Sequence, residues 1–516
     1  MAFLPDHSNS GSPKEISMIN RRSFLGAGVA AASVALVGTA DAASTGEWGR
    51  LRRRLTGDLV LPSDGGYDQA RRLASAQFDS IRPRAVAYCE TEADVSLCLR
   101  FAQNEALPIT VRSGGHSFVG WSTGNGLVVN LSRMSSVRVG EHSVRLGPAA
   151  QAVDVVAALA PHGVTVPAGF CPTVCPGGFV TGGGMGWQFR KHGPTSDRLL
   201  SARVVLADGR TVVASENQHP DLLWALRGGG GGNFGVVTDF ELEPTVERSV
   251  VHFTLNWPWD VADTVLNRWQ EWAEHTDAAL APRAGLLLDD AKPGAVPKVI
   301  VTGVHFGTTA EATAVLDELV SLIGTSPTNR VVEQLSYERA MMRQFGCENS
   351  SVEQCHLTGA NPEALLPRTS FVLHRSRMFA DPVPAAGVDD LLGAFDADRA
   401  AGQYRWLGFL SLGKNANSVR ADATAYVHRD ATLFAVYTVG LANPGPEARA
   451  AGVSWVNGGF AAMDPHSNGR TYVNYPDEAL TDWRDAYYGE NYDRLVRVKR
   501  RYDPDGLLRL PHGVGL

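Results

Sequence analysis

Four short glycine-rich runs constrain this chain more than any other feature of its sequence. They lie at residues 114–115, 177–178, 182–186 and 228–232. The chain has 54 glycines in 516 residues. Glycine adopts left-handed backbone conformations at little cost and lets the main chain approach a ligand closely. Runs of this kind beside strand-like segments predict turns that together line a binding site.

The length and composition predict a folded protein with more than one domain. A chain of 516 residues exceeds the usual size of one core, and its content of 44% hydrophobic and 20% charged residues is typical of soluble enzymes. The formal net charge of −7 and the lack of a basic stripe argue against nucleic acid as a partner. No CxxC or HxxxH pair occurs, so we expect no metal site.

Residues 1–43 have the pattern of an export signal. Arg21 and Arg22 precede an apolar stretch at residues 26–37, and a small-residue cleavage sequence follows. The alternative is a membrane anchor, but spanning needs about 20 apolar residues and this stretch is shorter. We therefore expect a twin-arginine signal and a secreted protein with no membrane attachment after cleavage. In that compartment Cys347 and Cys355 are candidates for a disulfide.

The region from residue 45 to 245 alternates strand and helix patterns. We expect strands at residues 85–88, 108–112 and 127–131, and a helix at 91–106 that Thr91 caps. The glycine turn after the second strand lacks GxGxxG and leads to another strand rather than a helix, which excludes a Rossmann unit. Further strands are expected at residues 143–146, 199–206, 210–213 and 235–242.

The region from residue 246 to 459 has a different pattern, because the long glycine runs stop there. Strand-like segments at residues 285–288, 299–306 and 433–439 alternate with helical ones such as 310–323. We interpret this region as a second domain inserted into the first, with residues 460–516 returning to complete the first domain.

Two of the glycine-rich turns carry a side chain that could react. His116 follows Gly114 and Gly115 at the end of a strand, and Cys171 lies in a proline-flanked turn before another glycine run. Taken alone, His116 fits a hydrogen-bonded loop histidine better than a reactive group. Together, three glycine-rich turns, a histidine and a cysteine indicate one extended cofactor cradle.

In this order, the motifs resemble those of FAD-linked oxidases of the berberine bridge enzyme type. The matching segments are RSGGHS at 112–117, GxCPTV at 169–174, GGGxG at 182–186, GGGGGNFGVVT at 228–238 and YxNYxD at 472–477. The resemblance implies an α+β fold of the vanillyl-alcohol oxidase type: a PCMH-type FAD-binding domain (45–245 and 460–516) around an α+β substrate domain (246–459) built on an antiparallel sheet.

The resemblance also implies FAD that is bonded to the protein twice. The matching histidine of the family bonds to the flavin 8α-methyl group and the matching cysteine to ring atom C6, and these roles fall on His116 and Cys171. Cys175 stands where relatives usually have glycine, and we interpret it as a small buried residue rather than a competing link. The other flavin contacts that the motifs imply are Arg112, Ser113, Gly114, Gly115, Ser117, Val174, Gly177, Gly178, Gly182, Gly183, Gly186, Gly235, Val237, Asn474 and Asn491.

The catalytic base is the least certain assignment from sequence. The family often uses the second tyrosine of YxNYxD, here Tyr475, with Tyr472 as the runner-up; the alternative is that both only pack along a half-buried strand. A tyrosine needs surroundings that lower its pKa to act as a base at neutral pH. Other relatives use a glutamate from the central strands, but Asp422 is the only carboxylate in residues 407–429.

Substrate contacts are open at this stage. Tyr404, Tyr426, His428 and Arg429 could each reach the site or pack within the sheet. Tryptophans that would suit a sugar substrate are Trp272, Trp406 and Trp455, although such residues are more often core. Val174, three residues after Cys171, is of the type that the family's oxidases have where oxygen reaches the flavin.

We therefore expect a secreted oxidase that removes a hydride from an alcohol or hemiacetal carbon of a sugar or secondary metabolite. Oxygen would regenerate the FAD and give hydrogen peroxide. One alternative is an oxidative cyclase that acts at a benzylic or allylic C–H, and a second is a flavin-binding protein without turnover. The expected partners are the small-molecule substrate and O2, and the expected assembly is a monomer or small homo-oligomer.

Overall fold

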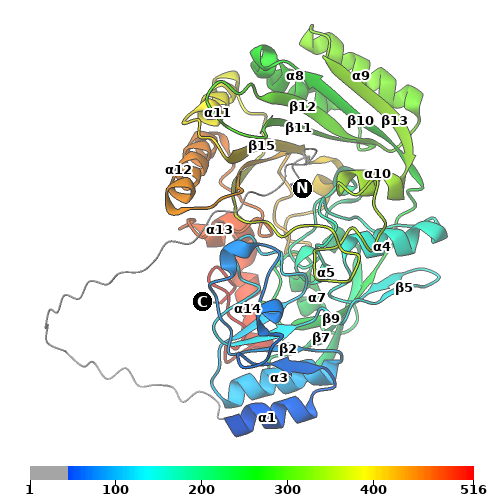
Figure 1. The fold of residues 1–516 in the computed structure, drawn as a ribbon. Coiled ribbons are helices and arrows are strands. Elements are labelled where there is room, and N and C mark those ends of the chain that lie inside the picture. Colours follow the sequence, from blue (N-terminus) through cyan, green and yellow to red (C-terminus); the bar gives the residue numbers. More distant parts are fainter. Residues whose placement is uncertain (1–44, 516) are drawn as a thin grey trace, which may run out of the picture.

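The computed structural model describes residues 45–515, and the twin-arginine segment lies outside them. The described strands form three sheets of four, five and seven strands (Figure 1). None of the helices between residues 45 and 515 is long and apolar enough to cross a membrane. The same residues contain no cluster of histidine, cysteine and carboxylate side chains that could hold a metal ion.

The four-stranded sheet has the order β1-β2-β4-β3, with β2, β4 and β3 parallel. Its strands are β1 (Asp58–Val60), β2 (Ala85–Tyr88), β3 (Ile109–Arg112) and β4 (Leu127–Asn130). Helix α3 (Glu92–Asn104) connects β2 to β3, and helix α1 (Thr45–Arg54) packs against α3. Thr91 caps α3 in a capping box with Asp94, which satisfies backbone N–H groups of its first turn. The predicted strands, helix and cap are confirmed.

The five-stranded sheet is antiparallel and has the order β5-β6-β9-β7-β8. Its strands are β5 (Val137–Val139), β6 (Val144–Leu146), β7 (Leu199–Val205), β8 (Thr211–Ser215) and β9 (Val236–Leu242). Around it lie α4 (Ala152–Leu159), α7 (Pro220–Leu226), α13 (Trp483–Tyr488) and α14 (Tyr492–Tyr502). Leu495 and Val498 of α14 share a buried cluster with Val144 and Leu146, so the C-terminal segment packs on this sheet.

The C-terminal segment also holds the last glycine run in place. The Lys499 ammonium is buried, and it donates to the Asn233 carbonyl at 2.6 Å and to the Asp503 carboxylate at 2.6 Å. The Asn233 side-chain oxygen in turn accepts from the Val514 backbone N–H at 3.1 Å. The turn at 228–232 is therefore tied to residues 499–514.

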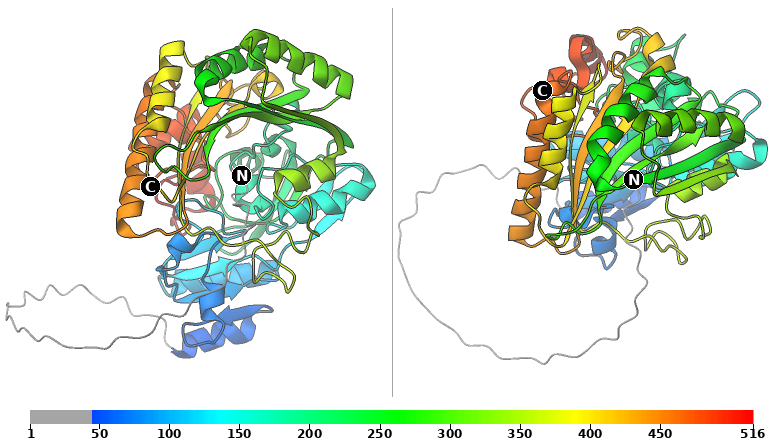
Figure 2. Two further views of the ribbon diagram at one scale, coloured as in Figure 1. Left: turned by 45° about the horizontal axis from the view of Figure 1, so that its top comes forward. Right: turned by 90° about the horizontal axis from the view of Figure 1, so that it is seen from above.

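The seven-stranded sheet is antiparallel and has the order β13-β10-β12-β11-β15-β16-β14. Its strands are β10 (Ser249–Trp257), β11 (Leu280–Leu288), β12 (Lys298–His305), β13 (Asn329–Ser336), β14 (Val372–Phe379), β15 (Gln403–Ser411) and β16 (Leu433–Leu441). Four helices cover its outer face (Figures 1 and 2): α8 (Ala262–His275), α9 (Thr309–Ile323), α11 (Ala385–Asp396) and α12 (Pro446–Met463). The predicted fold class is confirmed. The domain boundary placed at residue 459 falls inside α12, which continues unbroken to Met463.

The two faces of this sheet have different roles because side chains alternate along each strand. Ala284, Leu286 and Leu288 of β11 belong to the core under the outer helices, and Arg283 points to the opposite face. At one edge, α10 (Tyr337–Gln344) follows β13 and leads to a disulfide between Cys347 and Cys355. The predicted pairing of these two cysteines is confirmed.

Candidate active site

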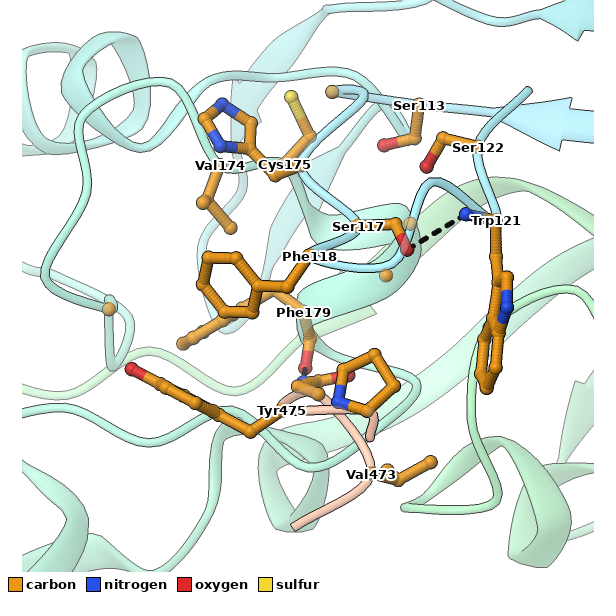
Figure 3. A pocket seen from close by; sticks show the side chains of 18 of the residues that line it. Ser113, Ser117, Phe118, Trp121, Ser122, Val174, Cys175, Phe179, Val473 and Tyr475 are labelled. Carbon is orange, nitrogen blue, oxygen red and sulfur yellow. Dashed lines mark hydrogen bonds between the residues drawn. The ribbon is translucent and has the colours of Figure 1, made fainter. Parts of the chain in front are cut away.

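A cavity of about 420 Å³ lies between the inner face of the seven-stranded sheet and the glycine-rich turns of the two smaller sheets. This volume is within the range of small-molecule and cofactor sites. The wall on the side of the smaller sheets comes from the turns around residues 113–118, 169–179 and 230–235, and residues 472–476 close one side. Figure 3 shows Phe118 between Val174 and Tyr475 in this wall.

His116 and Cys171 lie on the same wall and share a neighbour. The His116 Nε2 atom is 2.8 Å from the Thr173 hydroxyl, and the Cys171 Sγ atom is 3.9 Å from the same oxygen. Burial lowers the pKa of His116 to about 4, so its ring is neutral at pH 7 and keeps a lone pair for bonding. One hydroxyl thus joins the two side chains that the sequence predicts to bond to FAD.

Cys175 has the surroundings of a packing residue. It is 5% exposed, and its Sγ atom contacts the Ala149 and Thr173 carbonyls at 3.4 and 3.6 Å. Burial raises the pKa of its thiol well above the usual value, so the reactive thiolate is scarce. These contacts agree with the interpretation of Cys175 as a small buried residue.

Tyr475 and Tyr472 both line the cavity, but in different settings. The Tyr475 ring is packed 5.1 Å from the rings of Phe118 and Phe434, centre to centre. The Tyr472 oxygen accepts hydrogen bonds from the Gly184 N–H at 2.6 Å and from the Asn474 amide at 2.8 Å. These donors hold Tyr472 in place, whereas Tyr475 faces the cavity without such bonds among the described contacts.

The surroundings of Tyr475 differ from what a base at neutral pH requires. Burial raises its pKa, and the positive charge of Arg283 opposes that rise. A tyrosine base at neutral pH needs a lowered pKa, and the described surroundings of Tyr475 shift its pKa upward instead. The two tyrosines also lie in a turn rather than on a strand, because residues 471–477 pair with no strand of the described sheets.

The structure brings most of the predicted site residues together. Those that line the cavity are Ser113, Gly114, Gly115, His116, Ser117, Cys171, Val174, Gly177, Gly178, Gly235, Val237, Tyr472, Asn474 and Tyr475. Those that lie behind its walls are Arg112, Gly182, Gly183, Gly186 and Asn491.

The residues behind the walls position the lining instead of contacting a ligand. The Arg112 guanidinium is buried and donates to the Ala70 carbonyl at 2.7 Å and to the Ser122 carbonyl at 3.0 Å. A Cβ atom at Gly182 would overlap the Asn474 side chain, so glycine is needed for that close approach. Asn491, assigned to a flavin contact by resemblance, donates to the Ala421 and Thr424 carbonyls at 2.8 and 3.2 Å. The amide nitrogen therefore binds the loop at 421–424, and the flavin contact of Asn491 stays a prediction.

Of the three tryptophans that the sequence suggests for a sugar substrate, Trp406 lines the cavity, and Trp121 lines it as well. A Cβ atom at Gly285 or at Gly408 would overlap its indole, so the ring lies against the sheet over two strands that carry no side chain at these positions. The other two candidates, Trp272 and Trp455, are buried in the core under the outer helices. Trp406 therefore offers an apolar surface for a flat or ring-shaped ligand.

Arg283 and His374 are cavity residues that the sequence analysis misses. Arg283 comes from β11 and is 9% exposed, and His374 comes from β14 with its Nδ1 atom 2.7 Å from the Thr438 hydroxyl. Burial lowers the pKa of His374 to about 3, so its ring is neutral. Along both strands these residues alternate with core residues, and this alternation can be seen in the sequence. It does not show which face of the sheet lines the cavity, so it could not identify the two residues alone.

The remaining polar candidates of the substrate region do not line the cavity. Tyr426 and His428 are buried behind it, and Arg429 pairs with Asp197 at 2.7 Å. Asp422 is exposed and pairs with Arg420, so it is no candidate for a base. Tyr404 is half-buried and packs beside the lining residues.

The cavity has the features that FAD requires. No aspartate or glutamate of residues 45–515 lines it, so nothing in the described lining repels the negative pyrophosphate. A Cβ atom at Gly178 would meet no atom within 4 Å, which means that the backbone there faces open space. Backbone N–H groups of such glycine turns form nests for anions, and neutral His116 and Cys171 supply two groups for bonding.

The comparisons with known proteins agree with this site. The FAD binding domain model matches residues 83–215, and the berberine and berberine like model matches residues 471–515. The uncharacterized FAD-linked oxidoreductase YgaK of Bacillus subtilis (strain 168) is 29% identical over 90% of this chain and 98% of its own length. Chitooligosaccharide oxidase of Gibberella zeae is 28% identical over 88% of this chain and 92% of its own.

The fold is also that of a solved relative. The structure of berberine bridge enzyme from Eschscholzia californica matches with a TM-score of 0.80 and 21% identity, over 91% of this chain and 99% of its own. The family models cover the segments that carry four of the five motifs, and the glycine run at 228–238 lies outside both. The chain therefore carries an FAD binding domain, and over nearly its whole length it is similar to FAD-linked oxidoreductases of the berberine bridge enzyme type.

Proposed function

We propose that the protein is an oxidase that holds FAD covalently through His116 and Cys171 and oxidises an alcohol or hemiacetal carbon of a sugar or secondary metabolite. The observation that carries this proposal is the shared contact of His116 and Cys171 with the Thr173 hydroxyl. Both groups lie on one wall, within reach of one ring system. When bound, FAD supplies the hydride acceptor, and O2 accepts the electrons as hydrogen peroxide.

Tyr475 is the proposed base for the substrate hydroxyl. The Tyr475 hydroxyl lines the cavity and makes no hydrogen bond among the described contacts. The positive charge of Arg283 favours the deprotonated form of this tyrosine. Tyr472 is the weaker candidate, because two N–H donors already bind its oxygen. Val174 lies on the wall with Cys171, where a small side chain leaves room for O2.

An oxidative cyclase is the second candidate function, and the aromatic lining favours it. Phe118, Phe434 and Trp406 surround the space beside Tyr475, and such surfaces suit a substrate with a benzylic C–H bond. Product analysis separates the two functions, since an oxidase yields a carbonyl compound or lactone and a cyclase yields a new ring. A product of unchanged ring count excludes the cyclase.

We also propose that the protein is exported through the twin-arginine route as a monomer or small homo-oligomer. The support is the Arg21-Arg22 pair with its apolar stretch, and the Cys347–Cys355 disulfide, which suits an oxidising compartment. Replacing both arginines by lysine should retain the protein in the cytoplasm, as measured by fractionation. Export of that variant at the normal level would refute the route.

The experiment that tests the cofactor proposal is the mass of the acid-denatured protein. We expect the mass of FAD to remain on the wild type and on the single variants His116→Ala and Cys171→Ala, because one bond suffices, and to be lost from the double variant. Cys175→Ala is the matched control. It should keep FAD whenever His116 or Cys171 is present to form a bond. Release of free FAD from the wild type would refute covalent attachment, and purified protein that no donor reduces would favour a flavin-binding protein without turnover.

A further inference from the structure

Arg283 is a buried positive charge in the cavity wall that no carboxylate neutralises. Its side chain is 9% exposed, and it lines the cavity from the inner face of β11. Within residues 45–515, no aspartate or glutamate forms an ion pair with it. The titratable groups that face it are the phenols of Tyr475 and Tyr404, which are neutral at pH 7 because burial raises their pKa values.

The contacts of Arg283 fix its direction but leave donors free. Its Nη1 atom donates to the Gln344 side-chain oxygen at 3.2 Å, and its guanidinium lies over the Phe170 ring, 4.4 Å from the ring centre. Both partners are neutral, so they orient the group without cancelling its charge. A guanidinium has five N–H donors in a planar fork, and this fork matches a carboxylate.

Arg283 also differs from the other permanent charge in the lining. Arg509 is exposed and belongs to the C-terminal loop beside the last glycine run. Two histidines of the lining, His116 and His374, are neutral because burial lowers their pKa values to about 4 and about 3. The substrate side of the cavity therefore has one fixed positive charge in an apolar, aromatic wall.

Burying a lone charge is unfavourable, and such groups in proteins are paired or bind a ligand of opposite charge. We propose that the substrate carries a carboxylate that binds Arg283, with its ring against Trp406 and its reacting carbon toward Tyr475. The inference rests on the proposed function and names the class of substrate: an acid such as a hexuronic acid or an aromatic acid.

Calorimetric titration of the purified protein with benzoate and with its neutral analogue benzamide tests the inference. The wild type should bind benzoate at least tenfold more tightly. Arg283→Gln should weaken benzoate binding by roughly 30-fold or more, the usual effect of removing one partner of a buried charge pair, and leave benzamide binding unchanged. Arg283→Lys, which keeps the charge without the fork, should fall between the two.

Arg343→Gln is the matched control. Arg343 is on α10 next to Gln344, pairs with Glu333 and Glu348, and does not line the cavity, so its loss removes one positive charge nearby without changing the site. This variant should keep the preference for benzoate. If Arg283→Gln does not fold, Gln344→Leu, which removes only the orienting contact, should reduce the same preference.

The calorimetric test of Arg283 can fail or succeed independently of the mass experiment that tests the proposed function. Calorimetry detects probe binding whether or not FAD is attached, so loss of FAD in the mass experiment leaves this test intact. Equal affinity of the wild type for benzoate and benzamide, or a preference for benzoate that survives in Arg283→Gln, would overturn the inference. With active holoenzyme, Arg283→Gln should raise KM for a hexuronic acid more than for the parent hexose, with a smaller change in kcat.

Discussion

The wall of glycine-rich turns and the wall formed by the seven-stranded sheet meet at one cavity but are built in different ways. In the first, each residue proposed to bond to FAD lies within a short sequence motif, with His116 next to two glycines and Cys171 two residues before Thr173. In the second, Arg283, His374 and Trp406 come from three strands that are far apart in sequence. Turns that present backbone N–H groups suit a cofactor that relatives share. Single side chains on a rigid sheet suit a substrate that varies among relatives.

The largest effect is expected at the point where the two walls meet. Tyr475→Phe removes the proposed base but keeps the ring that packs against Phe118, so kcat should fall by roughly 10²–10⁴-fold, the usual contribution of general base catalysis. Stopped-flow measurement of flavin reduction gives this rate directly. The mass of attached FAD should not change, because the proposed bonds to the flavin come from His116 and Cys171. A variant that reduces its flavin at the wild-type rate would move the base elsewhere.

The second prediction concerns pH. Burial raises the pKa of Tyr475, and a base acts only when deprotonated, so the active fraction grows as pH rises toward that pKa. The kcat/KM should therefore increase with pH, by up to about tenfold per unit, and reach no plateau below about pH 10, the ordinary value for tyrosine. Tyr475→Phe should have a flat profile over this range. A plateau near neutral pH in the wild type would mean that a different group is the base.

The third prediction tests the wall that holds the cofactor. Val174→Leu adds one methylene group beside Cys171, and we expect the reaction of reduced flavin with O2 to slow on the order of tenfold, or about 1.4 kcal/mol of barrier. The rate of flavin reduction by substrate should stay the same. Val174→Ala is the control in the opposite direction and should not slow reoxidation. Equal slowing of both half-reactions would show a general distortion instead of an effect on oxygen.

The smallest effect is expected on the substrate sheet. Gly408→Ala adds a methyl group that overlaps the Trp406 indole, so the ring must shift, and kcat/KM should fall a few-fold through KM while FAD remains attached. Gly440→Ala is the matched control on β16, because its added Cβ would lie 3.5 Å from Tyr404, an ordinary contact. If both variants have wild-type KM values, Trp406 does not contact the substrate.

The contrast between the glycine-rich turns and the seven-stranded sheet also explains which residues of the site the sequence predicts. The strands around the glycine runs, the Thr91 cap and the placement of His116 and Cys171 follow from local patterns, because each signal lies within a few neighbouring residues. Arg283 gives no such signal, since the face of β11 that it occupies depends on packing with α8 and β15. For Asn491 the family motif is present, but the motif does not predict that the amide nitrogen binds the carbonyls of the loop at 421–424.

The contacts of Lys499 and Val514 with Asn233 have a consequence for the order of events during synthesis. The glycine run at 228–232 leaves the ribosome long before its supports at 499–514, and Tyr472, Asn474 and Tyr475 also come late. A nascent chain therefore cannot close the cavity, whatever its N-terminal half has folded into. We therefore expect stable cofactor binding to require that residues 472–514 have docked.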